Sequence, residues 1–461
     1  MTEYPLPENT KKLYTEMPLI APIQTALKQT GYTHPTPIQE AVIPLILDKK
    51  DILGIAQTGT GKTAAFCLPL IQNLYSQKQR PKEPRVLILA PTRELALQIH
   101  ENFQQYSQFA NLKSAAIFGG VGQTPQVNQI RQGVDVLIAT TGRLLDLYEQ
   151  KYINFSKIEC LVLDEADRML DMGFYPDIQR ILKLVPQKRQ NLFFSATMPK
   201  EVTQLASQIL KDPIRVEITP ESKTADKVEQ FAYYVDKDKK LDLLIHLLQN
   251  PDLKKVIVFT EMKHVANRLA EKLVAARIKS SAIHGNKSQS ARQKALDEFK
   301  SNKLRVLVAT DIAARGIDVD DITHVINFEL SHLTENYVHR IGRTARASAS
   351  GTAISFCTAE EKSFLFAIEK TIRQKIPIIV DQPFHSDSVE GAQIHSLGKA
   401  KAILESRRLE VKNQRRKEFR KNKPAKKSSD SSNRPAKSFN RFGGKKKSTN
   451  KSFSGYSKKS N

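Results

Sequence analysis

Short runs of β-branched and other apolar residues recur along the first 380 positions, and stretches with helical spacing separate them. Two such runs are 85–90 (RVLILA) and 255–259 (KVIVF). Runs that are apolar at every position are typical of parallel strands with helices covering both faces of the sheet. The pattern therefore predicts an α/β fold with parallel sheets.

The chain divides into three zones. Its 461 residues suggest two or three domains. We predict a first domain over residues 1–217, a polar linker over 218–228 and a second domain over 229–380. Residues 381–461 pass into Lys, Arg, Ser, Asn and Gly with isolated aromatics. Such a composition buries too little apolar surface to fold, so we expect a disordered basic tail.

The two predicted domains resemble each other. The strand and helix start at Val86–Ala96 have a counterpart at Val256–Ala266, and Asp135–Thr140 resembles Arg305–Thr310. A loop with Gly and Arg follows each member of the second pair. One duplicated α/β unit is the simplest explanation. Coincidence between generic strand compositions is the alternative that matches of six residues leave open.

Charge is concentrated at one end of the chain. Residues 399–461 hold 22 Lys and Arg against 4 Asp and Glu, a net +18 of the chain's +24. A tail of this kind indicates a polyanionic partner, and nucleic acid is the first candidate. A tail that only increases solubility would have the same composition. No apolar run approaches the length of about 18 residues typical of a membrane span. The N-terminal MTEYPLPENTKKLY lacks a signal peptide's apolar run, so we expect a cytoplasmic protein.

The three cysteines are predicted to be buried apolar residues rather than metal ligands or disulfide partners. Cys67, Cys160 and Cys357 stand alone in apolar runs and form no CxxC pair.

A phosphate-binding loop is predicted after the apolar run 52–55. A glycine-rich loop and then a helical stretch follow that run, in the order of a P-loop. Glycines let backbone N–H groups surround a phosphate, and the start of the helix adds partial positive charge. Lys62 would reach the β- and γ-phosphates, and the Thr63 hydroxyl would hold Mg²⁺. The predicted nucleotide-binding residues of this loop are Ala56, Gln57, Thr58, Gly59, Thr60, Gly61, Lys62 and Thr63.

Two carboxylates end another apolar run, 161–163, about 100 residues later. Asp164 can hold Mg²⁺, through water, and Glu165 can orient and deprotonate an attacking water. A solvated acidic turn is the alternative interpretation, and the upstream P-loop disfavours it. Together the two segments predict an ATP-hydrolysing site.

The residues Asp164-Glu165-Ala166-Asp167 spell DEAD, and the chain resembles the DEAD-box ATP-dependent RNA helicases over roughly residues 14–375. The segment Ala282–Gln289 makes it most similar to the bacterial RhlE-type branch. The resemblance implies two tandem RecA-like P-loop-type domains. It also implies that ATP and Mg²⁺ are the cofactors.

The segment Gly31–Gln39 resembles the family's Q motif, in which Gln39 would select adenine. A carboxamide both donates and accepts, which suits adenine N6 and N7. The family normally has Phe at the upstream aromatic position, and this chain has Tyr14 there. The aromatic ring is kept, so we expect Tyr14 to contribute to nucleotide binding.

The resemblance also implies a site that binds the sugar-phosphate backbone of RNA, since Arg and Thr side chains and exposed glycine amides suit phosphate and sugar contacts. The family usually has Pro at Thr141, so we expect a less rigid loop there with binding retained. Ser195, Thr197, Asp167, His339 and Arg340 are implied to couple hydrolysis to strand separation. The implied RNA contacts are Pro91, Thr92, Arg93, Gly119, Gly120, Thr140, Gly142, Arg143, His284, Gly285, Gln289, Arg292, Thr310 and Gly316.

The second domain is implied to complete the ATP site, because it has no P-loop of its own. Asp318 would meet the ribose, and Arg343 and Arg346 would act as arginine fingers at the γ-phosphate. The family most often has Gly at Ala345, where a side chain is strained if φ is positive.

We therefore predict an RNA-dependent ATPase that separates short RNA duplexes or remodels RNA by closing two domains on a single strand. RNA clamping, remodelling of RNA–protein complexes and DNA translocation are the rival classes. Ribosomal or RNA-decay proteins are candidate partners, and we expect a monomer. Five aromatics in the tail either stack on bases or have no role: Phe419, Phe439, Phe442, Phe453 and Tyr456.

Overall fold

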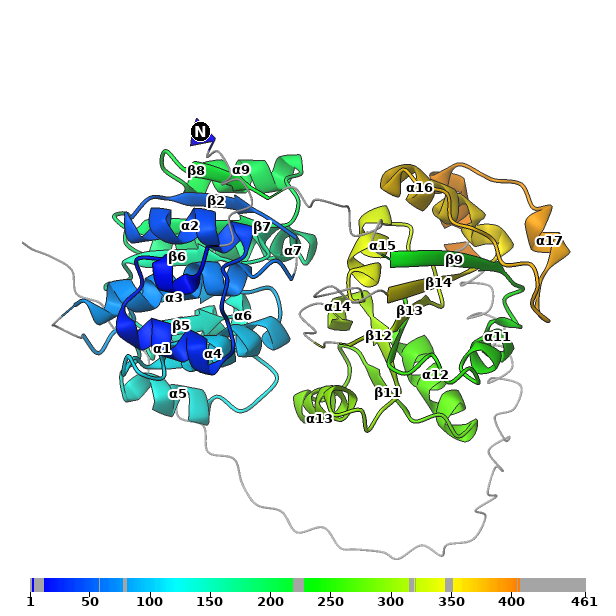
Figure 1. Ribbon diagram of the computed structural model, residues 1–461, viewed down its shortest axis with the longest axis horizontal. Coiled ribbons are helices and arrows are strands. Elements are labelled where there is room, and N and C mark those ends of the chain that lie inside the picture. Colours follow the sequence, from blue (N-terminus) through cyan, green and yellow to red (C-terminus); the bar gives the residue numbers. More distant parts are fainter. Residues whose placement is uncertain are drawn as a thin grey trace, which may run out of the picture. The chain divides into compact units, whose positions relative to one another are not determined.

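The structure is a computed structural model that describes residues 2–3, 12–57, 59–77, 81–218, 228–314, 319, 321–344, 351–403 and 405–406. These residues form two sheets in which every pair of neighbouring strands is parallel (Figure 1). The prediction of parallel α/β domains is confirmed.

The first sheet has the order β1-β8-β2-β7-β6-β3-β5-β4. Its strands are β1 (Thr2–Glu3), β2 (Ile52–Ile55), β3 (Val86–Leu89), β4 (Ser114–Ile117), β5 (Val136–Ala139), β6 (Cys160–Leu163), β7 (Gln190–Ser195) and β8 (Ile214–Glu217). Its helices are η1 (Tyr14–Glu16), α1 (Ala21–Gln29), α2 (Pro37–Leu47), α3 (Lys62–Tyr75), α4 (Arg93–Ser107), α5 (Thr124–Arg131), α6 (Thr141–Glu149), α7 (Ala166–Asp171), α8 (Tyr175–Leu184) and α9 (Lys200–Ile209).

Both faces of this sheet are covered, which explains why its strands are apolar throughout. Successive residues of a strand point to opposite faces. Val86 and Ile88 accordingly pack in a core with α1–α4, whereas Leu87 and Leu89 pack in a second core with α6–α9. The helices of the first domain surround its sheet in the ribbon view (Figure 1).

The second sheet has the order β11-β12-β10-β13-β14-β9. Its strands are β9 (Val228–Tyr234), β10 (Val256–Thr260), β11 (Ser280–Ile283), β12 (Val306–Thr310), β13 (His324–Asn327) and β14 (Gly351–Cys357). The accompanying helices are α11 (Lys240–Leu247), α12 (Lys263–Ala275), α13 (Gln289–Lys300), α14 (Asp311–Ala314), α15 (Thr334–Ile341), η2 (Ala359–Glu361), α16 (Lys362–Ile372) and α17 (Asp387–Glu390).

The predicted internal repeat is present in the strand order. Reading from β2 and from β9, the sheets run β2-β7-β6-β3-β5-β4 and β9-β14-β13-β10-β12-β11, so β3 and β5 correspond to β10 and β12. The registers also correspond: Val86 pairs with Val136, and Val256 pairs with Val306. Coincidence of strand composition would not reproduce both the order and the register of six strands.

Residues assigned to the tail from sequence include some that are packed. Val389 and Ala400 are each 1% exposed, and Ala400 belongs to the core cluster that contains Ile368. The Lys362 ammonium donates to the Glu390 carbonyl at 2.6 Å. Of the predicted linker, residues 219–227 lie outside the described residues, as do residues 407–461 of the tail.

The three cysteines are buried and unpaired by disulfides, as predicted. Among the helices that the structure describes, none is both long and apolar enough to cross a membrane.

Candidate functional site

The predicted site residues of the first domain lie at one edge of its sheet. In a parallel sheet all strands end on the same side, where ligands usually bind. Four loops follow β2, β3, β6 and β7, and they carry the P-loop, Pro91–Arg93, Asp164–Asp167 and Ser195–Thr197. Strand order thus brings together segments that are more than 130 residues apart in sequence.

The P-loop has the backbone of a phosphate cradle. Gly59 and Gly61 have φ of +88° and +87°, a left-handed conformation that favours glycine. Lys62 begins α3, and its ammonium donates to the carbonyls of Ala56 at 2.6 Å and Gln57 at 3.1 Å. The loop therefore presents its lysine and the start of a helix to the same space.

The Q motif is bonded directly to this loop. The Thr36 hydroxyl donates to the Thr60 carbonyl at 2.8 Å, and Gln39 Nε2 donates to the Gly61 carbonyl at 3.0 Å. A side chain at Gly61 would meet Gln39, because an added Cβ would lie 2.3 Å from Gln39 Nε2. Sequence reasoning did not single out Thr36. Its signal was the pattern Thr36-Pro37-x-Gln39, a capping box at the start of α2.

The two carboxylates of the DEAD segment lie directly beyond β6. Asp164 is 2% exposed, and Glu165 is 4% exposed with φ of 51°, an uncommon conformation for a residue with a side chain. Burial raises the pKa of the Asp164 carboxyl to about 7, against the opposing effect of the Lys62 ammonium. A carboxylate in this setting needs a positive partner to stay ionised at neutral pH.

The donor set fits a magnesium ion. Mg²⁺ prefers hard oxygen ligands, usually one or two carboxylates together with water and substrate phosphates. Thr63 follows Lys62 at the start of α3 and offers a hydroxyl, and Asp164 offers the buried carboxylate. A divalent cation would supply the charge that keeps Asp164 ionised.

Asp167 connects the DEAD segment to the Ser195–Thr197 segment. Its Oδ2 accepts from the backbone N–H and the hydroxyl of Thr197, both at 2.9 Å. Its own backbone N–H donates to Ser195 Oγ at 3.3 Å, and that hydroxyl donates to the Thr197 carbonyl at 2.7 Å. The structure thus joins three of the five residues predicted to couple hydrolysis to strand separation.

The predicted RNA contacts of the first domain form a second group at this edge. The Arg93 guanidinium lies against Gly120, where an added Cβ would approach its Nη1 to 2.0 Å. Gly119 directly precedes Gly120. On the other side of this glycine pair, Arg143 Nη2 donates to the Val121 carbonyl at 3.2 Å. The loops after β3, β4 and β5 therefore meet and present two arginines beside glycine backbone.

The remaining members of this group lie at helix starts. Thr92 caps α4 by accepting from Leu95 N at 3.3 Å, and Thr140 is the residue before α6. Pro91 precedes the first cap, and Gly142 lies in the first turn of α6. Backbone N–H groups at helix starts suit phosphate contacts.

Thr141 has a bonding partner that the sequence did not indicate. It is fully buried at the first position of α6, and its hydroxyl donates to Asp177 Oδ2 of α8 at 3.0 Å. The Thr141 hydroxyl, at a position where the family usually has proline, thus links α6 to α8.

In the second domain, the predicted RNA contacts follow β11 and β12, which are neighbours in the sheet. His284 and Gly285 follow β11, and Thr310 ends β12. Gln289 and Arg292 share the first turn of α13, which Ser288 caps by accepting from Ala291 N at 3.3 Å. The parallel register places both strand ends at the same edge.

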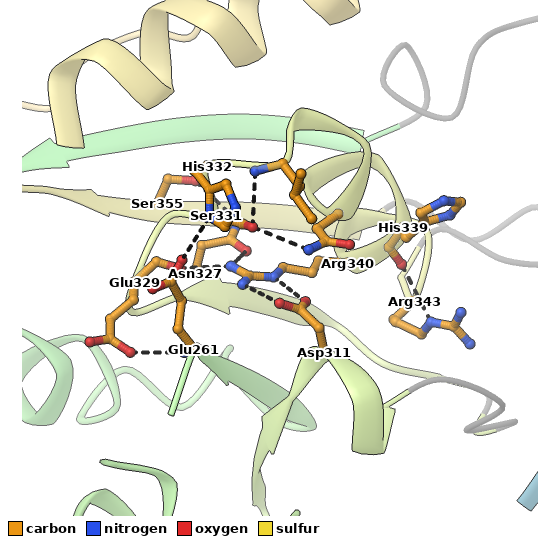
Figure 2. Close-up of polar contacts among 12 residues, drawn as sticks. Glu261, Asp311, Asn327, Glu329, Ser331, His332, His339, Arg340, Arg343 and Ser355 are labelled. Carbon is orange, nitrogen blue, oxygen red and sulfur yellow. Dashed lines mark hydrogen bonds and ion pairs between the residues drawn. The ribbon is translucent and has the colours of Figure 1, made fainter. Parts of the chain in front are cut away.

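Arg340 is held by a buried network inside the second domain (Figure 2). Its Nε and Nη2 donate to the two carboxylate oxygens of Asp311 at 2.6 and 2.8 Å. Its Nη1 donates to Asn327 Oδ1 at 3.2 Å and to the Glu329 carbonyl at 2.7 Å. The guanidinium also lies 5.1 Å from the centre of the Phe259 ring. Sequence reasoning missed these partners, because they lie within or shortly after three different strands, β10, β12 and β13.

Arg343 lies one turn further on than His339 and points away from the Arg340 network (Figure 2). Its Nε donates to the His339 carbonyl at 3.4 Å. Four predicted site residues lie outside the described residues: Thr58, Gly316, Asp318 and Arg346. Ala345 and the five aromatics of the tail also lie outside them.

Family comparisons agree with this arrangement. Residues 36–205 match the DEAD/DEAH box helicase model, and residues 239–348 match the helicase conserved C-terminal domain model. The chain is 40% identical to the ATP-dependent RNA helicase RhlB of Shewanella amazonensis, covering 80% of this chain and 85% of that protein. It is also 40% identical to the DEAD-box ATP-dependent RNA helicase CshA of Bacillus subtilis, covering 82% and 76%.

Solved structures of RNA-bound proteins are similar to this chain. S. cerevisiae Dbp5 bound to RNA and ADP BeF3 has a TM-score of 0.70 at 30% identity, covering 80% of this chain and 95% of that one. Mss116p bound to ssRNA and AMP-PNP has a TM-score of 0.73 at 26% identity, covering 84% and 83%.

Proposed function

Because the chain belongs to the DEAD-box ATP-dependent RNA helicases, we propose that it separates short RNA duplexes or remodels RNA by closing its two RecA-like domains on a single strand. One observation carries this proposal: the loops predicted to bind ATP and those predicted to bind RNA end neighbouring strands of one sheet. Nucleotide state and RNA contact can therefore influence each other over a short distance.

ATP is assigned to the β2, β6 and β7 side of the edge. Lys62 would exchange its bonds to loop carbonyls for the β- and γ-phosphates. Thr63 and Asp164 would hold Mg²⁺, which would draw charge from the phosphate oxygens. Glu165, next to Asp164, would accept the proton of the attacking water.

RNA is assigned to the β3, β4 and β5 side of the same edge and to the loops after β11 and β12. Arginine and backbone N–H groups read phosphate and sugar without sequence preference. Such contacts suit a single strand bent away from duplex geometry, so binding would favour opened base pairs. The network of Asp167, Ser195 and Thr197 follows β6 and β7 on the ATP side. Because β6 neighbours β3 in the sheet, this network would pass a change at Glu165 to the RNA side.

Arg343 and Arg346 are proposed to neutralise the γ-phosphate in the transition state, a contribution of about 10³–10⁵ in rate for arginine fingers. Asp318 would bind the ribose. Both roles require the two domains to close. ATP and RNA together would drive this closure, so hydrolysis should depend on RNA.

Finer assignments rest on sequence. We assign the chain to the RhlE-type branch from the segment Ala282–Gln289, and we propose a cytoplasmic location and a monomer. The basic residues after 406 would hold structured RNA near the core by charge. Ribosomal and RNA-decay proteins stay candidate partners.

The test is ATP hydrolysis by the full chain with and without single-stranded RNA, compared with single-stranded DNA. We expect stimulation by RNA, far weaker stimulation by DNA, and loss of both in Glu165→Gln. RNA binding by that variant should persist, since the substitution removes only the base. Equal rates with and without RNA would contradict coupling between the two sides of the edge.

A further inference from the structure

Tyr14 has a polar contact that phenylalanine at this position would lack. Its hydroxyl donates to Gln39 Oε1 at 2.5 Å, and both side chains are buried, at 4% and 5% exposed. The backbone N–H of Tyr14 donates to the Thr33 carbonyl at 3.0 Å, which fixes the short helix η1 against the Q motif. The phenol is therefore a fixed part of the Q motif's polar surroundings.

The orientation of the Gln39 carboxamide is determined by its other partners. Oε1 also accepts from the backbone N–H of Thr36 at 2.7 Å, and Nε2 donates to the Gly61 carbonyl at 3.0 Å. An N–H can only donate and a carbonyl can only accept, so a flipped amide would lose both bonds. Tyr14 must then donate its hydrogen to Oε1.

These hydrogen bonds limit how many further hydrogen bonds the Gln39 carboxamide can form. A carboxamide oxygen has two lone pairs, and Thr36 and Tyr14 occupy both. One N–H of Nε2 is left, so in this arrangement Gln39 can donate once more but has no lone pair left to accept with. Adenine presents one donor (N6–H) and one acceptor (N7) at this edge, whereas guanine presents two acceptors. Gln39 alone would bind N7 of either purine.

Tyr14 supplies the missing acceptor. With its hydrogen committed to Gln39, the phenol oxygen can only accept. We propose that the Tyr14 hydroxyl is a nucleotide-selecting group that accepts from the exocyclic amine of adenine, while the remaining N–H of Gln39 donates to N7. This inference rests on the proposed ATP site. Burial, with Tyr32 adding to it, raises the pKa of the Tyr14 phenol, so the hydroxyl keeps the proton that fixes this polarity.

The test pairs a missing protein group with a missing ligand group. We compare the full chain with Gln39→Met, and with the double variant that adds Tyr14→Phe, at saturating single-stranded RNA. The substrates are ATP and purine riboside triphosphate, which lacks the amine. Tyr14→Phe by itself frees a lone pair on Gln39 Oε1 that can accept from the amine in place of the phenol, so Gln39 is removed in both variants. One neutral hydrogen bond corresponds to about a two- to tenfold preference in kcat/KM. We expect that preference for ATP in the unchanged protein and in Gln39→Met, and a ratio near one in the double variant. The penalty for 7-deaza-ATP, which lacks N7, should fall in both variants, because both lack the Gln39 amide.

Tyr106→Phe is the matched control. Tyr106 is also a buried tyrosine of the same core, at 3% exposed, and it packs near Tyr32 rather than Gln39. Loss of the Tyr106 hydroxyl, alone or added to Gln39→Met, should leave the ratio of kcat/KM for ATP to that for purine riboside triphosphate unchanged. Unfolding temperatures of all these variants separate a loss of selectivity from a loss of stability.

Three results would overturn the inference. The first is an unchanged protein that hydrolyses both nucleotides equally well, and the second is a preference for ATP that is already lost in Gln39→Met. The third is a preference that survives in the double variant, which would mean that a group other than Tyr14 accepts from the amine. Failure of the proposed function would differ: RNA would stimulate hydrolysis of none of these nucleotides.

Discussion

Replacing Arg340 by methionine should destabilise the second domain strongly. Methionine has a similar length, but it removes four hydrogen bonds: two to Asp311, one to Asn327 and one to the Glu329 carbonyl. Arg340 is 2% exposed, and the Asp311 side chain is 18% exposed. The variant would therefore leave a largely buried carboxylate without its cation.

Removing one partner of a buried ion pair costs about 3–5 kcal/mol. A domain of 150–250 residues loses about 2–4 °C in Tm per kcal/mol, so the second domain's transition should fall by about 6–20 °C. Arg340→Lys keeps the charge without the planar geometry, so its loss should be smaller. Asp311→Asn added to Arg340→Met should recover part of the loss, because the unpaired charge is then gone.

Calorimetry of the full chain measures these shifts, and hydrogen exchange locates them. Protection should fall in peptides that cover Asp311–Ala314 and Thr334–Ile341, and it should be unchanged in peptides from the first domain. A loss below about 1 kcal/mol in Arg340→Met would refute the reasoning, since so small a loss is typical of exposed ion pairs. A double variant as unstable as the sum of the two single variants would refute the claim that Asp311 is the stranded partner.

Three further predictions test other parts of the structure. Gly61→Ala should raise the KM for ATP at least tenfold, because its φ is +87° and the new Cβ would strike Gln39; unchanged KM would exclude this close approach. Thr141→Val should lower the first domain's stability by about 1 kcal/mol through loss of the bond to Asp177, whereas Thr141→Pro should retain RNA-stimulated hydrolysis, because proline is tolerated at the first position of a helix. Truncation after residue 406 should raise the RNA concentration for half-maximal activity and flatten its salt dependence without changing Tm, whereas truncation after residue 398 should also lower Tm, because it removes the buried Ala400.

Local pattern was sufficient to predict the strands, because each face of a doubly covered sheet demands apolar residues. The runs at 86–89 and 256–259 are strands, and the resemblance between the two halves reappears as matching order and register. The P-loop conformation was also predictable, since Gly59 and Gly61 adopt the positive φ that the motif requires.

Long-range polar pairing was not predictable in the same way. The sequence gives the aromatic ring of Tyr14, but not the position of its hydroxyl relative to a side chain 25 residues later. It gives the absence of a proline at Thr141, but not Asp177 as a partner. It gives the polar composition near residue 400, but not the core cluster to which Ala400 belongs. Each contact depends on how separate elements pack, which local periodicity does not encode.

The duplicated fold gives the second domain a lysine at the position of the P-loop lysine, but with different surroundings. Lys240 begins the helix after β9, as Lys62 begins the helix after β2. Its ammonium, however, is buried between Glu361 at 2.6 Å and the Phe328 carbonyl at 2.8 Å, and no glycine-rich loop precedes it. A lysine that is held in a buried ion pair is not available to bind a phosphate. The equivalent position holds a structural ion pair. This agrees with our proposal that the second domain would contribute to the ATP site through other side chains, such as Arg343.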